Sequence, residues 1–127
     1  MKTALVLLLL MLLPVMAWGF TATQTGAEVT LTWYEPTTNT DGSPLNDLAK
    51  IRVYDNYSGV MTMVKEVNAS GPTGGSTEST TVTVPVTAGQ EKNVIFYVTA
   101  VDDDGNESPP SNTKTVNIDR LAPASPE

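Results

Sequence analysis

The 127-residue chain contains no cysteine and no histidine. These absences exclude disulfides, cysteine–histidine and serine–histidine–aspartate catalysis, imidazole acid–base chemistry and the usual zinc ligands. Paired carboxylates could still hydrolyse glycosides, but the acidic residues cluster in one turn, Asp102–Asp104, and do not face one another across a visible cleft. The sequence therefore predicts a protein that is not an enzyme and needs no cofactor or metal.

Basic residues are also scarce. Beyond residue 19, six Lys and Arg residues stand against all fourteen Asp and Glu residues, which gives a net charge of −8. Nucleic-acid binding needs basic patches that neutralise phosphates, and the sequence contains no such patch. We therefore expect no nucleic-acid partner and an acidic surface that suits an exported protein.

Long apolar runs are confined to the N-terminus, where Lys2 precedes an apolar stretch at residues 4–15. Ala17 and Gly19 place small residues at the −3 and −1 positions of a cleavage site, which is the layout of a secretory signal peptide. The apolar run is about 15 residues, shorter than the roughly 20 that a membrane-spanning helix needs. We expect residues 1–19 to be a signal peptide, with an uncleaved anchor as the alternative. The rest of the chain is then secreted, extracellular or periplasmic, with no stable membrane span after cleavage.

The remaining sequence shows almost no helical periodicity and alternates apolar with polar residues, as half-buried strands do. Strands are expected at residues 21–25, 28–33, 50–55, 60–67, 80–86, 94–100 and 113–118. The run at 60–67 suits a sheet edge, because Lys65 and Glu66 would discourage aggregation. Seven short strands in about 100 residues predict an all-β, seven-stranded β-sandwich. It would form one domain at residues 20–118, followed by a Pro-rich, extended tail at 119–127.

The inward positions of these strands define the expected core. They are Trp33, Ile51, Val53, Val82, Val84, Val94, Phe96, Val98 and Ala100. Three polar loops, at residues 37–49, 68–79 and 102–110, are expected at the two ends of the sandwich, where loops commonly bind ligands. The loop at 68–79 lacks apolar anchors, so we expect it to be mobile.

Two stretches, VTLTWYEPTTNTDGSPLNDLAKIRVYDNYSG and YVTAVDDDGNESPPSN, resemble a fibronectin type III domain, which has an immunoglobulin-like fold. The resemblance covers residues 22–118, and the chain is most similar to short exported domains of this family from bacteria and phages. Trp33 matches the core tryptophan that the family carries on its second strand. The tyrosine that usually opens the sixth strand is replaced by Val94, so the tyrosine-corner hydrogen bond should be absent and the stability lower. The chain has no Arg-Gly-Asp tripeptide, so the family's integrin-binding role does not carry over. The resemblance implies the fold and says little about function.

Three tyrosines are candidates for a binding surface. Tyr34 and Tyr54 face away from the core on their strands, and Tyr57 lies in the turn after the third strand. Together they could form an exposed aromatic patch for a sugar or a protein partner. Cross-strand support of a solvated sheet face is the simpler explanation.

Acidic loop residues are the second group of candidates. Asp102, Asp104 and Asn106 surround Gly105, and Asp41 lies in the loop at 37–49. The spacing from Asp102 differs from that of an EF-hand calcium loop, and a hairpin turn is the favoured interpretation. Whether this turn binds calcium stays open.

We expect a secreted, non-catalytic binding or adhesion module that contacts a protein or a polysaccharide at the cell surface or outside the cell. The alternative is a structural accessory subunit of an exported assembly or a phage virion or tail, packed through a sheet face or an edge strand. A third option is an accessory domain of a polysaccharide-degrading complex. The sequence does not identify the partner.

Overall fold

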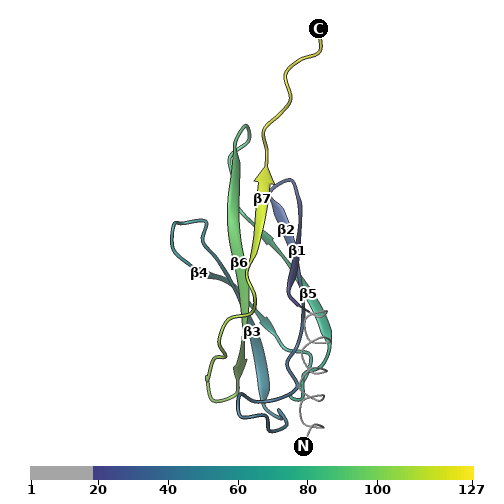
Figure 1. Ribbon diagram of the computed structural model, residues 1–127, viewed down its shortest axis with the longest axis vertical. Coiled ribbons are helices and arrows are strands. Elements are labelled where there is room, and N and C mark those ends of the chain that lie inside the picture. The colour runs from purple at the N-terminus through teal and green to yellow at the C-terminus, as the bar shows by residue number, and fades with distance from the viewer. Residues whose placement is uncertain (1–18) are drawn as a thin grey trace, which may run out of the picture.

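The computed structural model describes residues 19–127, and the signal peptide expected at 1–19 lies almost wholly outside them. The strands are β1 (Thr21–Thr25), β2 (Glu28–Tyr34), β3 (Leu48–Asp55), β4 (Thr62–Asn68), β5 (Thr77–Thr83), β6 (Glu91–Asp102) and β7 (Lys114–Asp119). They form two antiparallel sheets, in the orders β1-β2-β5 and β4-β3-β6-β7 (Figure 1). The prediction of an all-β, seven-stranded, sandwich-like fold is confirmed. In residues 19–127, no helix reaches the length and apolar character that crossing a membrane requires.

The observed strands lie within a few residues of the predicted ones, and β5 differs most. The alternating run was expected at residues 80–86, with Pro85 marking an edge strand or a strand end; β5 begins at Thr77, ends at Thr83 before Pro85, and lies at the edge of its sheet. A proline has no N–H to donate to a sheet ladder, so the strand ends before it. Residues 77–79 carry no apolar signal, yet they pair with residues 32–34 of β2.

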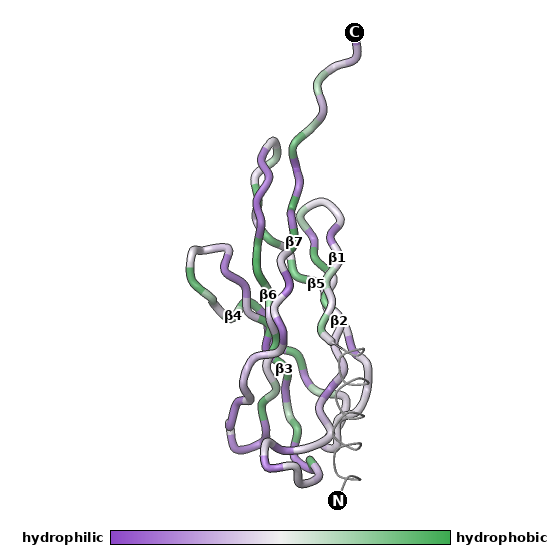
Figure 2. The backbone as a smooth tube through the Cα atoms, viewed as in Figure 1, coloured by the Kyte–Doolittle hydropathy of each residue, from purple (hydrophilic) through white to green (hydrophobic). Residues whose placement is uncertain are grey.

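One buried cluster fills the space between the sheets, and Figure 2 shows hydrophobic stretches along the strands while the loops are mostly hydrophilic. Its members are Phe20, Val29, Leu31, Trp33, Ile51, Val53, Val82, Val84, Val86, Val94, Phe96, Val98, Val116 and Ile118. Of the predicted core residues only Ala100 is not fully buried, and it packs at the margin of the cluster. Ala100 pairs in regular register with the buried Ile51, so it does lie on the core side, near the end of the cluster. The register of β3 against β6 shifts one step further on, between Leu48 and Lys50, opposite Val101 and Asp102, and Val101 is also buried.

All three long loops lie at one end of the sandwich, so their predicted distribution over both ends was wrong. β2, β4 and β6 finish at this end, and β3, β5 and β7 start there (Figure 1). The loops comprise residues 35–47, 69–76 and 103–113, and we call this surface the loop end. The segment after β7 leaves the opposite end as an extended tail (Figure 1).

Two serines complete the edge of β6 where β7 does not reach it. The N–H of Ser108 donates to the Ala100 carbonyl at 2.8 Å, and the Ala100 N–H donates back to Ser108 Oγ at 2.9 Å. Ser111 pairs with Val98 in the same way, at 2.9 and 3.0 Å. Each serine thus replaces a rung of the sheet ladder, while the intervening prolines offer no N–H that could recruit another strand.

The side chain of Tyr57 connects the two sheets near the start of β6. Val94 is fully buried, but the hydroxyl of Tyr57 donates to the Pro85 carbonyl at 2.9 Å, just before β6. Lys92 Nζ lies 4.6 Å from the centre of the Tyr57 ring. Tyr57 therefore joins the two sheets, which fits the structural alternative given for these tyrosines better than an exposed aromatic patch.

Removing the Tyr57 hydroxyl should cost about 1 kcal/mol of unfolding free energy, the usual net value of one hydrogen bond. The variant Tyr57→Phe keeps the ring and its contact with Lys92, so urea denaturation isolates the bond to Pro85. Tyr97→Phe is the control, because no hydrogen bond of its hydroxyl occurs among the described residues, and it should change stability by less than about 0.5 kcal/mol. Equal losses in the two variants would contradict this role of Tyr57.

Candidate functional site

Backbone hydrogen bonds tie the three loops of the loop end together. The N–H of Leu48, where the first loop meets β3, donates to the Pro72 carbonyl of the second loop at 3.0 Å. The N–H of Asp103 in the third loop donates to the Asp47 carbonyl of the first loop at 3.0 Å. Because these partners are distant in sequence, the loops form one continuous surface.

A buried carboxylate, Glu35, fixes the second loop. Glu35 is 0% exposed, and its two oxygens accept the N–H and the hydroxyl of Ser70 at 2.8 and 2.5 Å. Ser76 donates its N–H to the same carboxylate at 3.4 Å and accepts the Glu35 N–H at 2.9 Å. The loop expected to be mobile for lack of apolar anchors therefore has a polar anchor.

Sequence reasoning missed Glu35, although a signal was present. The inward positions of β2 are Val29, Leu31 and Trp33, and the same alternation places Glu35 on the inward side. A carboxylate at a core position must be satisfied by hydrogen bonds. Neighbouring Ser and Gly residues in a distant loop are suitable donors.

Two of the predicted acidic residues shape their own loops. Asp41 Oδ1 accepts the hydroxyl and the N–H of Ser43 at 2.6 and 2.9 Å, and these bonds lower the pKa of Asp41. Asp102 accepts the side-chain amide and the N–H of Asn106 at 3.0 and 2.8 Å, and the N–H of Asp104 at 3.0 Å. The bonds from Asn106 are the main reason that the pKa of Asp102 is lowered. These contacts are those of a tight acidic turn.

Among residues 19–127, one group of carboxylates lies close enough together to hold a cation, and it consists of Asp47, Asp102 and Asp104. Their oxygens lie within 4.8 Å of one another. Loss of solvation raises the pKa of Asp47, and repulsion from Asp102, Asp103 and Asp104 adds to the shift. Asn106, the other calcium ligand considered from the sequence, instead donates to Asp102. Asp47 escaped notice because it lies in a different loop.

Opposite pKa shifts predict opposite effects of two matched substitutions. Because the pKa of Asp47 is raised in the folded protein, the ionised Asp47 side chain destabilises the fold at a pH above its pKa in the unfolded chain. This destabilisation disappears as the pH falls and Asp47 becomes protonated. Asp47→Asn should therefore raise the Tm at pH 7. The lowered pKa of Asp41 means that its ionised form stabilises the fold at neutral pH, and that this contribution is lost as the pH falls.

Asp41→Asn should accordingly lower the Tm at pH 7, and both differences should be smaller near pH 3, because that pH lies below the unperturbed Asp pKa of about 3.9. Thermal unfolding of the two variants in the presence of a chelator, at pH 7 and at about pH 3, measures this. Shifts of the same sign at pH 7 would contradict the assignment.

The aromatic candidates do not form one patch. Tyr34 is 43% exposed on the outer face of the three-stranded sheet, whereas Tyr54 lies on the outer face of the four-stranded sheet, on the other side of the molecule. The Tyr54 ring lies 5.0 Å from that of Tyr97. Its hydroxyl donates to Glu107 at 2.5 Å, which raises the pKa of Tyr54. Tyr54 thus supports neighbouring strands, as the simpler explanation held.

An ion-pair network surrounds Tyr54 on the same face. Arg52 binds Glu107 at 2.9 Å and Glu66 at 2.8 Å, and Lys50 binds Glu66 at 3.1 Å. Thr99 donates to Glu107 at 2.6 Å, and this bond is the main cause of the lowered pKa of Glu107. The polar groups of this face satisfy one another, which leaves the loop end as the better candidate for contact with a partner.

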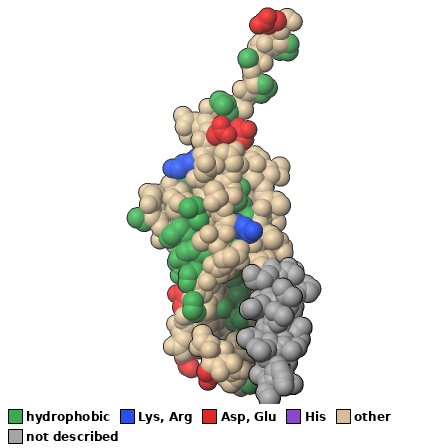
Figure 3. All heavy atoms as spheres, viewed as in Figure 1, with side chains coloured by type: hydrophobic (Ala, Val, Ile, Leu, Met, Phe, Trp, Pro, Cys, Tyr) green, Lys and Arg blue, Asp and Glu red, His purple; other side chains and the backbone are tan. Residues whose placement is uncertain are grey.

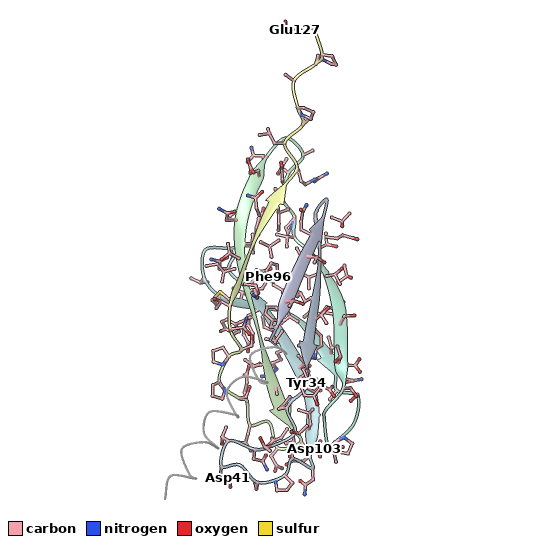
Figure 4. The ribbon with its side chains drawn as sticks, turned by 45° about the vertical axis from the view of Figure 1, so that its right-hand side comes forward. Tyr34, Asp41, Phe96, Asp103 and Glu127 are labelled. Atoms are coloured by element: carbon pink, nitrogen blue, oxygen red, sulfur yellow. The ribbon has the colours of Figure 1, made fainter. Side chains whose placement is uncertain are left out.

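Figure 4 shows Tyr34, Asp41 and Asp103 toward the loop end and Glu127 at the far tip of the tail. Comparison with known proteins finds no matching family model, no matching curated protein and no matching solved structure. The function must therefore be argued from the geometry of the loop end itself.

Proposed function

We propose that this protein is an exported, non-catalytic binding module of the fibronectin type III kind, which contacts its partner through the loop end. The observation that supports this most is the joining of three loops into one surface by Glu35 and by the bonds at Leu48 and Asp103. A surface ordered before binding loses less conformational entropy when the partner docks.

The charge of the loop end indicates the kind of partner. Its loops contain Asp41, Asp47, Asp103 and Asp104, and no Lys or Arg occurs in residues 35–47, 69–76 or 103–113. An acidic surface of this kind complements a basic one and speeds encounter with it. We therefore favour a protein partner with a basic patch over a neutral polysaccharide.

The test neutralises two acids at each end of the sandwich. Asp103→Asn with Asp104→Asn removes two exposed charges from the loop end, and Glu28→Gln with Glu91→Gln removes two from the opposite end. The partner is recovered by crosslinking to the exported chain in its producer. The first pair should weaken binding about five- to tenfold at low salt and much less at high salt, while the second pair should leave it nearly unchanged. Equal effects of the two pairs would refute the proposal.

A second candidate function, a structural subunit of an exported assembly, rests on β4. This strand forms one edge of its sheet, and Met63 and Val64 in it are exposed, as is Val60 just before it. Figure 3 shows hydrophobic side chains gathered on this flank. An exposed apolar edge can pair with a strand of another protein. In that case Val64→Lys should abolish assembly, and the neutralised loop-end variant should assemble normally.

A further inference from the structure

Phe20 lies at the boundary between the expected signal peptide and the sandwich. It is 3% exposed and belongs to the buried cluster between the sheets, whereas its neighbour Gly19 is exposed. The next residue, Thr21, already pairs with Thr32 in the ladder that joins β1 to β2. The ordered core therefore begins at the first residue after the expected cleavage site.

The side chain of Asn112, just before β7, holds the backbone of Phe20 from the other end of the sequence. Its Oδ1 accepts the Phe20 N–H at 3.2 Å, and its Nδ2 donates to the Phe20 carbonyl at 3.3 Å. One asparagine amide thus satisfies both backbone groups, as a rung of a sheet ladder would. These bonds fix the backbone of Phe20, while burial fixes its side chain.

This burial protects the peptide bond between Gly19 and Phe20. A protease has to bind the residues on both sides of the bond that it cuts, so a folded segment must first open. Burial of a phenylalanine side chain makes the open form about ten- to a hundredfold rarer. The bonds to Asn112 and the pairing of β1 with β2 oppose opening further.

Cleavage itself would leave the native contacts of Phe20 available. Hydrolysis by a signal peptidase consumes one water, breaks the amide between the two residues, and produces a Gly19 carboxylate and a Phe20 ammonium. The ammonium is still a hydrogen-bond donor, so Asn112 Oδ1 can accept from it, and the Phe20 carbonyl and ring are unchanged. A cleaved chain can therefore bury Phe20 as an uncleaved chain does.

We propose that folding blocks cleavage at the Gly19–Phe20 bond, so that the signal peptide is removed before Phe20 is buried, and a chain that folds first keeps it. The cleaved and anchored forms considered from the sequence are then two outcomes of one competition between cleavage and folding. This inference rests on the export that the proposed function includes, and it makes Phe20 the residue that couples processing to folding.

The first experiment compares the cleavage of two full-length precursors by the producer's signal peptidase in detergent micelles. One is the folded wild-type chain. The other is Phe96→Asp, which should not fold because it places a charge at a position that is 0% exposed, and whose residues 1–20 are unchanged. Circular dichroism checks both states, and mass spectrometry measures the product that begins at Phe20. The unfolded precursor should be cleaved at least about tenfold faster.

The two ways in which this comparison can fail are distinct. Equal rates of cleavage after Gly19 in the two precursors would overturn the proposal and leave the expected signal peptide in place. No cleavage after Gly19 in either precursor would contradict the cleaved signal peptide itself, and the proposal would fall with it.

The second experiment keeps the fold and weakens only the contacts that hold Phe20. Asn112→Ala should speed cleavage of the folded precursor about fivefold, the equivalent of one hydrogen bond of ordinary net strength. Asn117→Ala is the matched control, because it removes an exposed asparagine of β7 that bonds to Asn93 at 2.9 Å, and it should leave the rate unchanged. Neither substitution should matter in the Phe96→Asp background. Equal rates for the two asparagine variants in the folded precursor would overturn the proposal.

Discussion

Glu35→Ala should lower the free energy of unfolding by about 3 kcal/mol, because it leaves the N–H groups of Ser70 and Ser76 without their acceptor. Hydrogen bonds to a charged group are worth about 1.5–3 kcal/mol each, and the weaker one to Ser76 adds little. Denaturant unfolding measures the loss. Amide hydrogen exchange should also accelerate selectively in residues 69–76, since this carboxylate anchors that loop.

Two control variants distinguish the loss of the Glu35 hydrogen bonds from the general effect of removing a glutamate. Glu35→Gln keeps the size and one acceptor oxygen, so it should lose less than the alanine variant. Glu28→Ala removes an exposed glutamate from the other end of β2, and should change stability by less than about 0.5 kcal/mol. A loss in Glu35→Ala no larger than that of Glu28→Ala, or unchanged exchange at Ser70, would show that the carboxylate does not hold the loop.

Gly74→Ala should be equally damaging, at about 3 kcal/mol, for a different reason. A Cβ at this position would lie 1.9 Å from the Pro36 carbonyl oxygen, and the residue has φ = +64°. The left-handed backbone costs about 1–2 kcal/mol for alanine, and relieving the clash must displace one of two backbone segments, which costs about 1–3 kcal/mol more. The second loop should then separate from the first.

Gly26→Ala is a matched control for the backbone term. Gly26 has φ = +61°, and nothing lies within 4 Å of the Cβ that alanine would add. It should therefore lose only the conformational part, about 1–2 kcal/mol. Equal losses at Gly26 and Gly74 in urea denaturation would mean that close contact between the two loops adds no stability.

The alternation of side chains is why the sheets could be predicted from the sequence. Val29, Leu31 and Trp33 in β2, and Val94, Phe96 and Val98 in β6, have to share a face, because a strand repeats every two residues. Even the weak run at Thr21–Thr25 became β1 with those bounds. Alternation did not predict the burial of Val101, which lies next to the register shift between Leu48 and Lys50, and local sequence does not encode that shift.

The loop end could not be predicted, because its contacts join residues that are far apart in the sequence. Asp47 and Asp103 meet only once β3 and β6 are paired. The end at which each loop lies follows from the direction of the strands it joins. Strands β2, β4 and β6 all run toward the same end, so the loops that follow them lie together there and not at both ends. The same holds for Tyr57, whose bond to Pro85 connects segments that no short-range pattern relates.

The most direct test of the loop end as the contact surface is site-specific photocrosslinking in extracts of the producer. A photoreactive amino acid replaces either Asp103, at the loop end, or Glu91, at the opposite end, and both positions are exposed. Our account predicts one dominant crosslinked protein from position 103 that weakens as salt rises, and none from position 91. Crosslinks from position 91 alone, or equal and salt-independent crosslinks from both, would contradict it.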